Sequence, residues 1–204
     1  MNPAGEGKQT VEAEVPMAEM HDFCTYVRQV TQGRGSFTFT FERYEEAPSN
    51  VAQKVIDNVR TMGVAIRPCT VPAAGKPGFE LGEDEMEVGI GIHGEPGTHK
   101  EALPPADEIV DHILDKILSD IDYTGHEVAV MVNSSGATPL MELFIINNHV
   151  ADVLAAKGIK VYKTYVGEYM TSLEMEGFSV SLLRLDDELK VLLDAHADTI
   201  AFKA

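Results

Sequence analysis

Strand-like apolar runs alternate with helix-like stripes through most of this chain, and this order restricts the fold more than any other feature. Four runs are predicted as strands: 86–92 and 127–133, which have the apolar character of buried strands, and 159–167 and 178–185. A further strand is predicted at 64–72. Strands that alternate with helices are typical of α/β domains. The expected fold class is therefore α/β, with a mixed sheet and flanking helices over about residues 64–204.

Two amphipathic helices are predicted between these strands. The first follows Pro104-Pro105 and has its apolar residues on one helical face: Ile109, Ile113, Leu114, Ile117 and Leu118. The second covers 140–158, where Gly158 provides a C-terminal stop. After the last buried strand, residues 186–195 are predicted to return as a hairpin-type strand.

The first part of the chain has a different pattern. Residues 11–16 alternate like a strand, and 18–32 have helical spacing. Residues 36–44 alternate strictly, with three phenylalanines on one face, which predicts a half-buried strand. A helix is expected over 50–62, ended by Gly63. The predicted order of elements in this segment is therefore strand–helix–strand–helix.

Charge and cysteine content exclude several classes of protein. The 204 residues carry a formal net charge of −17 at pH 7, a surface that repels nucleic acid and anionic membranes. No apolar run approaches the roughly 18 residues of a membrane span, and the N-terminus lacks signal-peptide features. Cys24 and Cys69 show neither C-x-x-C nor metal-ligand spacing. We therefore expect reduced thiols, a cytoplasmic protein, no bound metal, and neither nucleic acid nor membrane as a partner.

The stretch "GIGIHGEPG" at 89–97 is the main candidate site. Gly89, Gly91 and Gly94 fit the dinucleotide pattern G-x-G-x-x-G, but that site needs a helix to begin at the glycines. Glu95-Pro96-Gly97 follows instead and favours a turn. Two interpretations remain: a tight strand exit with a solvated histidine, or glycines that clear space so that a small ligand can reach the ring of His93. If the glycines clear space for a ligand, His93 is expected to border an open cleft.

Other polar groups have less specific patterns. The loop "NSSGAT" at 133–138 lies between a strand and a helix, where helix capping is favoured over ligand binding. The acids Asp84, Glu85 and Glu87 precede the glycine-rich stretch and could be catalytic acids, but a charge run is usually a solvated face. His99 and His112 are close to His93 in sequence without a predicted common face.

Residues 57–204 resemble a known family. The stretches "VRTMGVAIRPCTVPAAGKPGFELGEDEMEVGIGIHGEPG", "NSSGATPLMELFIINN" and "TSLEMEGFSVSLLRLDDE" are similar, in this order, to the C-terminal half of the dihydroxyacetone kinase substrate-binding subunit. In that family the histidine of G-I-H-G-E-P-G forms a covalent hemiaminal with the ketone carbon of dihydroxyacetone. The resemblance implies His93 as the catalytic residue, with Gly91, Gly94 and Glu95 binding substrate. It also implies a phosphoryl donor on a separate, ADP-carrying subunit and no cofactor bound directly.

Residues 1–56 resemble a different family. The stretch "VEAEVPMAEMHDFCTYVRQVTQGRGSFTFTFERYEEAPSNVAQKVI" is similar to the C-terminal ferredoxin-like domain of translation elongation factor G, over a strand–helix–strand–helix half of it. No G-x-x-x-x-G-K-[ST] motif of a GTPase occurs in the chain. In the kinase family this place is taken by a portion that supplies a Gly-His substrate clamp and an acid–base aspartate, and neither is found here.

The sequence therefore predicts a chimera joined near Ile56-Asp57, with an elongation-factor-G-like partial segment at 1–56 and a kinase-subunit domain at 57–204. Three functions follow. The first is capture of dihydroxyacetone for a donor-carrying subunit, incomplete as a kinase alone; the second is a non-catalytic binding or assembly module. The third, association with the ribosome, is disfavoured by the acidic charge. Half a ferredoxin-like sheet leaves open strand edges. We therefore expect either the rest of the chain or a second copy to complete them, the latter giving a homodimer.

Overall fold

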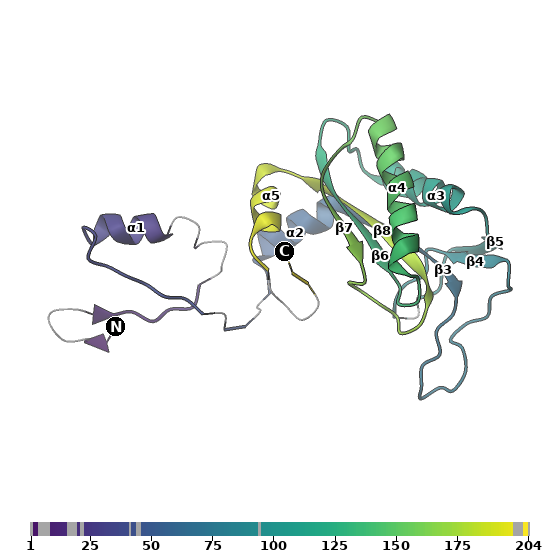
Figure 1. Ribbon diagram of the computed structural model, residues 1–204, viewed down its shortest axis with the longest axis horizontal. Helices are drawn as coiled ribbons and strands as arrows, with labels where there is room; N and C mark the ends of the chain where they lie inside the picture. Colours follow the sequence, from purple (N-terminus) through teal and green to yellow (C-terminus); the bar gives the residue numbers. More distant parts are fainter. Residues whose placement is uncertain are drawn as a thin grey trace.

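A computed structural model describes residues 2–3, 9–15, 20, 23–40, 42–43, 46–93, 95–197 and 202–203. The main strands are β3 (Val59–Arg67), β4 (Glu85–Val88), β5 (His99–Ala102), β6 (Glu127–Ser134), β7 (Lys160–Gly167) and β8 (Glu176–Leu185). They form one six-stranded sheet in the order β5-β4-β3-β8-β6-β7 (Figure 1). Only β6 and β7 pair in parallel; the other neighbours are antiparallel. The predicted α/β class with a mixed sheet is confirmed.

Helices pack on both faces of this sheet. The helices are α2 (Ser49–Asn58), α3 (Ala106–Asp120), α4 (Leu140–Ala156) and α5 (Asp187–Asp194). Alternate residues of β6 and β8 face α3 and α4, where they form the main core: Val128, Val130, Val132, Phe178, Val180 and Leu182. Ala129 and Leu185 instead pack with Leu189 of α5 and Val55 of α2. Figure 1 shows α3 and α4 side by side over the sheet. The period of two in the strands thus divides the apolar residues between two layers.

The predicted helix at 50–62 is too long. Helix α2 ends at Asn58, and β3 begins at Val59. Along its length β3 pairs with β8, from Val59 opposite Leu183 to Arg67 opposite Glu176. Gly63 lies within this strand rather than ending a helix, and a side chain there would press against the Phe178 carbonyl oxygen at 3.2 Å. Sheet pairing has overridden the helical spacing of Val59 and Met62.

The predicted hairpin-type return at 186–195 is also wrong, because these residues form helix α5. The Asp186 carboxylate accepts a hydrogen bond from the Leu189 N–H at 2.8 Å and so caps the helix. Asp187 and Glu188 then place negative charge in the first turn. The acidic start of "DDELKVLL" was the signal for a helix.

The strand predicted at 86–92 is shorter than expected, and one strand was not anticipated. Strand β4 ends at Val88, and Gly89 turns the chain with φ +79°. After the glycine-rich stretch, β5 returns antiparallel to β4, with His99 opposite Val88. Since β5 has the polar sequence His-Lys-Glu-Ala at the sheet edge, no hydrophobic alternation marks it.

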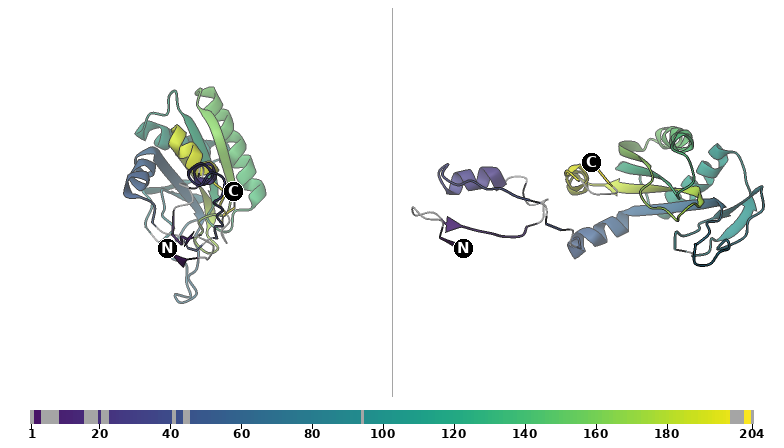
Figure 2. Two further views of the ribbon diagram at one scale, coloured as in Figure 1. Left: turned by 90° about the vertical axis from the view of Figure 1, so that its left-hand side faces the viewer. Right: turned by 60° about the horizontal axis from the view of Figure 1, so that its bottom comes forward.

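The N-terminal segment does not form the expected half of a ferredoxin-like sheet. Helix α1 (Phe23–Val30) is present, and β1 (Asn2–Pro3) pairs with β2 (Gln9–Thr10). The strands expected at 11–16 and 36–44 are irregular wherever the structure describes them, at 11–15, 36–40 and 42–43. Figure 1 and the right-hand view of Figure 2 show α1 and the β1–β2 hairpin to one side of the main sheet.

A lack of pairing partners explains this difference. A strand needs a neighbour to satisfy its N–H and C=O groups, and no strand of the described residues pairs with 11–15, 36–40 or 42–43. None of the described residues before Ser49 is buried. Phe37 contacts Phe23 with ring centroids 5.1 Å apart, a local contact rather than a core. The expected completion of a sheet edge by the rest of the chain does not occur among the described residues.

We predict that deleting residues 1–48 changes the free energy of unfolding of the sheet domain by less than about 0.5 kcal/mol, since nothing described before Ser49 is buried. Denaturation in guanidinium, followed by far-UV circular dichroism, measures this. Deleting residues 1–58 is the control, because it also removes Val55 and the Lys54 ammonium, which bonds to Asp186 at 2.8 Å. The longer deletion should be clearly destabilising; a loss above about 1 kcal/mol on the shorter one contradicts the prediction.

Candidate functional site

The loop between β4 and β5 is a hairpin closed by hydrogen bonds at its base. The Thr98 N–H donates to the Val88 carbonyl oxygen at 2.7 Å, and the Gly97 N–H donates to Oε1 of Glu87, also at 2.7 Å. Nearer the tip, the Gly91 N–H donates to the Glu95 carbonyl oxygen at 3.1 Å. These bonds fix residues 89–98 as a narrow loop. Among the described residues of this loop no helix begins, and the chain continues into β5. A dinucleotide site needs a helix that starts at the glycines, so the dinucleotide interpretation fails, as the sequence predicted.

Two glycines are required by close packing within this loop. A Cβ atom on Gly91 would lie 2.1 Å from Oε2 of Glu95, and one on Gly97 would lie 2.5 Å from the Val88 carbonyl oxygen. Any other residue at these positions would push the two arms of the hairpin apart. Gly94, a predicted substrate-binding residue, lies outside the described residues.

His93 is at the tip of the loop, with 81% of its side chain exposed. Its backbone N–H donates to Oε2 of Glu95 at 3.0 Å. Its ring nitrogen Nδ1 lies 3.6 Å from Oε1 of the same carboxylate. Glu95 therefore contacts both the backbone and the ring of His93, and the histidine is outside the apolar core.

The charge of Glu95 is favoured by its surroundings. Hydrogen bonds from its own backbone N–H and from that of His93 hold the pKa of the Glu95 carboxyl below its usual value of 4.5. A carboxylate beside Nδ1 favours the tautomer that carries its proton on Nδ1. The lone pair is then on Nε2, for which the described residues provide no hydrogen-bond partner. The arrangement suits a neutral imidazole that reacts through Nε2.

The neighbouring acids have other roles in the structure. The Glu85 carboxylate accepts the Gly82 N–H at 2.9 Å, and Asp84 is exposed. Glu87 is buried and bonds to Gly97. Among the described residues, none of these three carboxylates contacts the ring of His93.

His99 and His112 share a partner that the sequence did not reveal. Nε2 of His99 lies 3.4 Å from one oxygen of Glu101, and Nδ1 of His112 lies 3.3 Å from the other. The group forms because the His112 side chain of α3 reaches Glu101 on β5, a tertiary contact that no local pattern indicates. Within the described part of the chain, no set of three or more His, Cys, Asp or Glu residues fits a metal ion.

The "NSSGAT" loop joins two segments instead of capping a helix. The buried Asn133 side chain donates to the Met170 carbonyl oxygen at 2.7 Å and accepts the N–H groups of Tyr169 and Met170 at 2.8 and 2.9 Å. Thr138 exchanges two hydrogen bonds with the Gly177 backbone. Helix α4 has no side-chain cap. The favoured capping interpretation is wrong, and the loop fixes the segment between β7 and β8.

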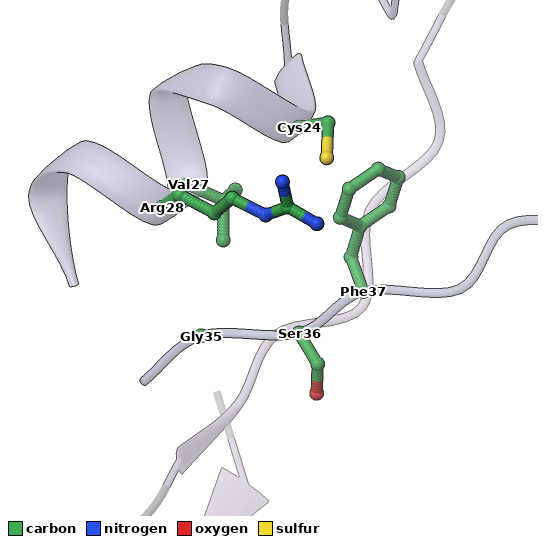
Figure 3. A pocket seen from close by; sticks show the side chains of 6 residues that line it. All are labelled: Cys24, Val27, Arg28, Gly35, Ser36 and Phe37. Carbon is green, nitrogen blue, oxygen red and sulfur yellow. The ribbon is translucent and has the colours of Figure 1, made fainter. Parts of the chain in front are cut away.

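Two surface hollows lie elsewhere. One lies between α1 and the segment after it; Figure 3 shows the Arg28 guanidinium reaching toward Cys24 and Phe37 across it. The other lies beside the ends of α3 and α4 and is lined by residues that include Tyr123 and Lys157. His93 lines neither of them, so the cleft expected at His93 stays a prediction. Among the described residues, no helix is long and apolar enough to cross a bilayer.

Two known sequence families match the chain, one in each of the two parts that its sequence patterns distinguish. The Dak1 domain family matches residues 46–201, and the elongation factor G C-terminus family matches residues 1–55. A Listeria innocua protein, the dihydroxyacetone-binding subunit DhaK of PTS-dependent dihydroxyacetone kinase 1, is 49% identical over 154 residues, covering 74% of this chain and 47% of the relative. The dihydroxyacetone-binding subunit DhaK of the PEP-dependent kinase of Escherichia coli is 35% identical over 181 residues, covering 76% and 51%. The chain thus spans about half the length of these curated relatives.

Solved structures agree with this match. The dihydroxyacetone kinase operon co-activator Dha-DhaQ superimposes with a TM-score of 0.68 at 33% identity, over 76% of this chain and 48% of that one. The dihydroxyacetone kinase from C. freundii in complex with AMP-PNP and Mg²⁺ gives a TM-score of 0.63 at 30% identity, over 71% and 27%. Both similarities cover most of the chain and only part of the other protein.

We predict that Asn133→Ala lowers the free energy of unfolding by about 1 to 3 kcal/mol, because it removes the three hydrogen bonds between the buried Asn133 side chain and the partly buried backbone of Tyr169 and Met170. Chemical denaturation measures the change. Asn148→Ala, at an exposed position of α4, is the matched control and should be nearly neutral. Equal effects of the two substitutions would show that the Asn133 contacts do not hold the loop.

Proposed function

The chain belongs to the Dak1 domain family, and from this premise we propose that it captures dihydroxyacetone as a covalent hemiaminal on His93. The observation that carries the proposal is the position of this histidine. Its ring is exposed at the tip of a fixed hairpin, with Nδ1 beside a carboxylate and Nε2 free of contacts among the described residues. Such a histidine can act as a nucleophile, because the carboxylate stabilises the positive charge that develops on the ring.

The proposed reaction balances without a cofactor. The lone pair of Nε2 forms a bond to the ketone carbon while the carbonyl π bond breaks and its electrons move to oxygen. The oxygen takes a proton from water and becomes a hydroxyl. The ring releases the proton of Nδ1 to Glu95 or to water, leaving a neutral adduct. Glycerol has no carbonyl group, so this bond selects ketones and aldehydes over polyols.

The remaining residues of the loop have supporting roles in this proposal. Glu95 orients the ring of His93 by its negative charge, since Oε1 of Glu95 lies 3.6 Å from Nδ1 of the ring. Gly91 has no side chain to obstruct a small ligand, and its packing against Glu95 keeps the loop narrow. Gly94 is assigned the same role from its place in the motif alone. Substrate binding by these three residues rests on the family motif together with this geometry.

We further propose that the chain is incomplete as a kinase. Phosphoryl transfer needs a held nucleophile, a base and a positioned donor. The chain spans about half the length of its curated relatives. Glu95 lies on the Nδ1 side of His93, and no other carboxylate of the described residues lies where it could take a proton from a hydroxyl of the captured substrate. The donor would come from a separate subunit, and the chain itself would bind no cofactor. We propose further that the protein is a cytoplasmic homodimer. Each chain would consist of a segment at 1–56 and a domain at 57–204. Both cysteines are free, which is consistent with a reducing compartment.

A non-catalytic binding function is the second candidate. It is supported by the similarity to Dha-DhaQ, which is an operon co-activator rather than a kinase. A domain of this fold can therefore serve a regulatory protein as well as an enzyme. The segment like elongation factor G gives little support for ribosome binding, because the whole chain carries a net charge of −17.

We predict that dihydroxyacetone labelled with ¹³C at its ketone carbon gives a new protein-bound signal of a tetrahedral carbon in nuclear magnetic resonance spectra. His93→Ala should abolish this signal, because it removes the nucleophile. His99→Ala is the matched control, since His99 lies on the adjoining strand and pairs with Glu101, and it should leave the signal intact. Labelled glycerol should give no adduct. A signal that survives His93→Ala would overturn the assignment.

We predict that the chain does not replace the dihydroxyacetone-binding subunit of the Escherichia coli kinase. The test supplies the remaining proteins of that PEP-dependent enzyme, phosphoenolpyruvate and dihydroxyacetone, and follows the phosphorylated product. Turnover should stay at the background rate, because the chain is proposed to lack the general base. A general base typically raises the rate by about 10² to 10⁴. Turnover near that of the intact subunit, lost on His93→Ala, would show that the chain is a complete substrate subunit.

A further inference from the structure

Glu87 is the one buried acidic residue in the described part of the chain, with 7% of its surface exposed. It lies on β4 opposite Ala65 of β3 and Lys100 of β5. Its contact with Gly97 at 2.7 Å joins the strand that leads into the glycine-rich loop to the arm by which the loop returns. Glu87 thus spans the base of the hairpin whose tip carries His93.

No cation compensates this buried carboxylate among the described residues. The ammonium group of Lys100, its cross-strand neighbour, bonds instead to the Glu80 carbonyl oxygen at 2.6 Å. Burying an ionised carboxylate is costly unless hydrogen bonds replace its water. The Gly97 N–H is the donor that the structure provides. A charged acceptor makes this hydrogen bond stronger than a neutral one would.

The geometry leaves little freedom at the point where Glu87 holds the loop. A Cβ atom on Gly97 would lie 2.6 Å from Cγ of Glu87 and 2.5 Å from the Val88 carbonyl oxygen. The next N–H, that of Thr98, bonds to the same Val88 oxygen at 2.7 Å. The returning arm is therefore pressed against β4 on both sides of the Glu87 contact.

Two carboxylates hold the hairpin at different heights. Glu95 bonds to the backbone of His93 at the tip, and Glu87 bonds to Gly97 at the base. Gly97 is two residues from Glu95, so a shift of the returning arm moves Glu95 and, with it, the contact to Nδ1 of His93. Positioning by this route acts through the backbone and needs no contact between Glu87 and a ligand.

We propose that Glu87 is a positioning residue for His93, acting through its hydrogen bond to Gly97. The inference rests on the proposed capture of a ketone by His93 and adds a residue outside the G-I-H-G-E-P-G motif to that site. Because the required property is a hydrogen-bond acceptor at this place, Gln can replace Glu and an apolar side chain of similar size cannot.

The test compares Glu87→Gln with Glu87→Met in the full chain. With ¹³C-labelled dihydroxyacetone as the probe, Glu87→Met is expected to weaken capture about tenfold or more, the factor that corresponds to a lost charge-assisted hydrogen bond. Glu87→Gln should keep capture within a few-fold of wild type. Gly97→Ala, which forces the two arms apart while Glu87 is retained, should weaken capture as Glu87→Met does.

Glu85→Met is the matched control. Glu85 is on the same strand and also accepts a glycine N–H, that of Gly82 at 2.9 Å, but outside the His93 loop. It should leave capture unchanged. Thermal unfolding of each variant identifies any loss of fold. If Glu87→Met is unfolded, Gly97→Ala and Glu87→Gln decide the question.

A second measurement separates this proposal from the capture reaction itself. Hydrogen exchange of the Gly97 amide and the ring resonances of His93 can be followed without any ligand. Glu87→Met should speed the exchange and shift the ring signals, and Glu87→Gln should do neither. If wild type captures no ketone, the proposed function fails and these two readouts alone decide the role of Glu87. Unchanged exchange and ring signals in Glu87→Met, or equal losses in the Met and Gln variants, would overturn it.

Discussion

The pairing of β3 with β8 is the contact on which the rest of the domain depends. On one side, β3 carries β4 and β5 and therefore the loop of His93; on the other, β8 carries β6 and β7 with their connecting helix α4. The two strands approach so closely at Gly177 that a Cβ atom there would lie 2.2 Å from the Val64 carbonyl oxygen. Glycine at this position lets the two parts of the sheet join without a gap.

This sheet supports the hairpin that carries His93. Val64 and Ala65 of β3 pair with Val88 and Glu87 of β4, and the Gly89 N–H bonds to the Gly63 carbonyl oxygen at 2.7 Å. The loop therefore starts from a strand fixed in the interior and ends in an edge strand. Its tip extends outward with an exposed imidazole. The proposed capture of a small molecule would depend on such a support, since a reacting group must be held in place by the structure beneath it.

Sequence patterns predicted the parts of the fold that have their own periodicity. The strands β6, β7 and β8 and the helices α3 and α4 were predicted correctly, and so were the loop of His93 and the failure of the dinucleotide pattern there. The errors have physical causes. Val59 and Met62 fit a helix stripe, but β8 provides a pairing partner that no local pattern reveals. The alternating phenylalanines of 36–44 fit a strand, but among the described residues no strand lies beside this segment. The pairing of Glu95 with Nδ1 and the burial of Glu87 follow from hairpin closure, which brings residues of opposite arms together.

A crystal of the full chain soaked in dihydroxyacetone would reveal whether Nε2 of His93 forms a bond to the carbon of a ketone. We expect continuous electron density from Nε2 to a tetrahedral carbon, with Nδ1 directed at Glu95. Dihydroxyacetone bound elsewhere, or found beside His93 as an intact planar ketone separated by a van der Waals gap, would contradict it.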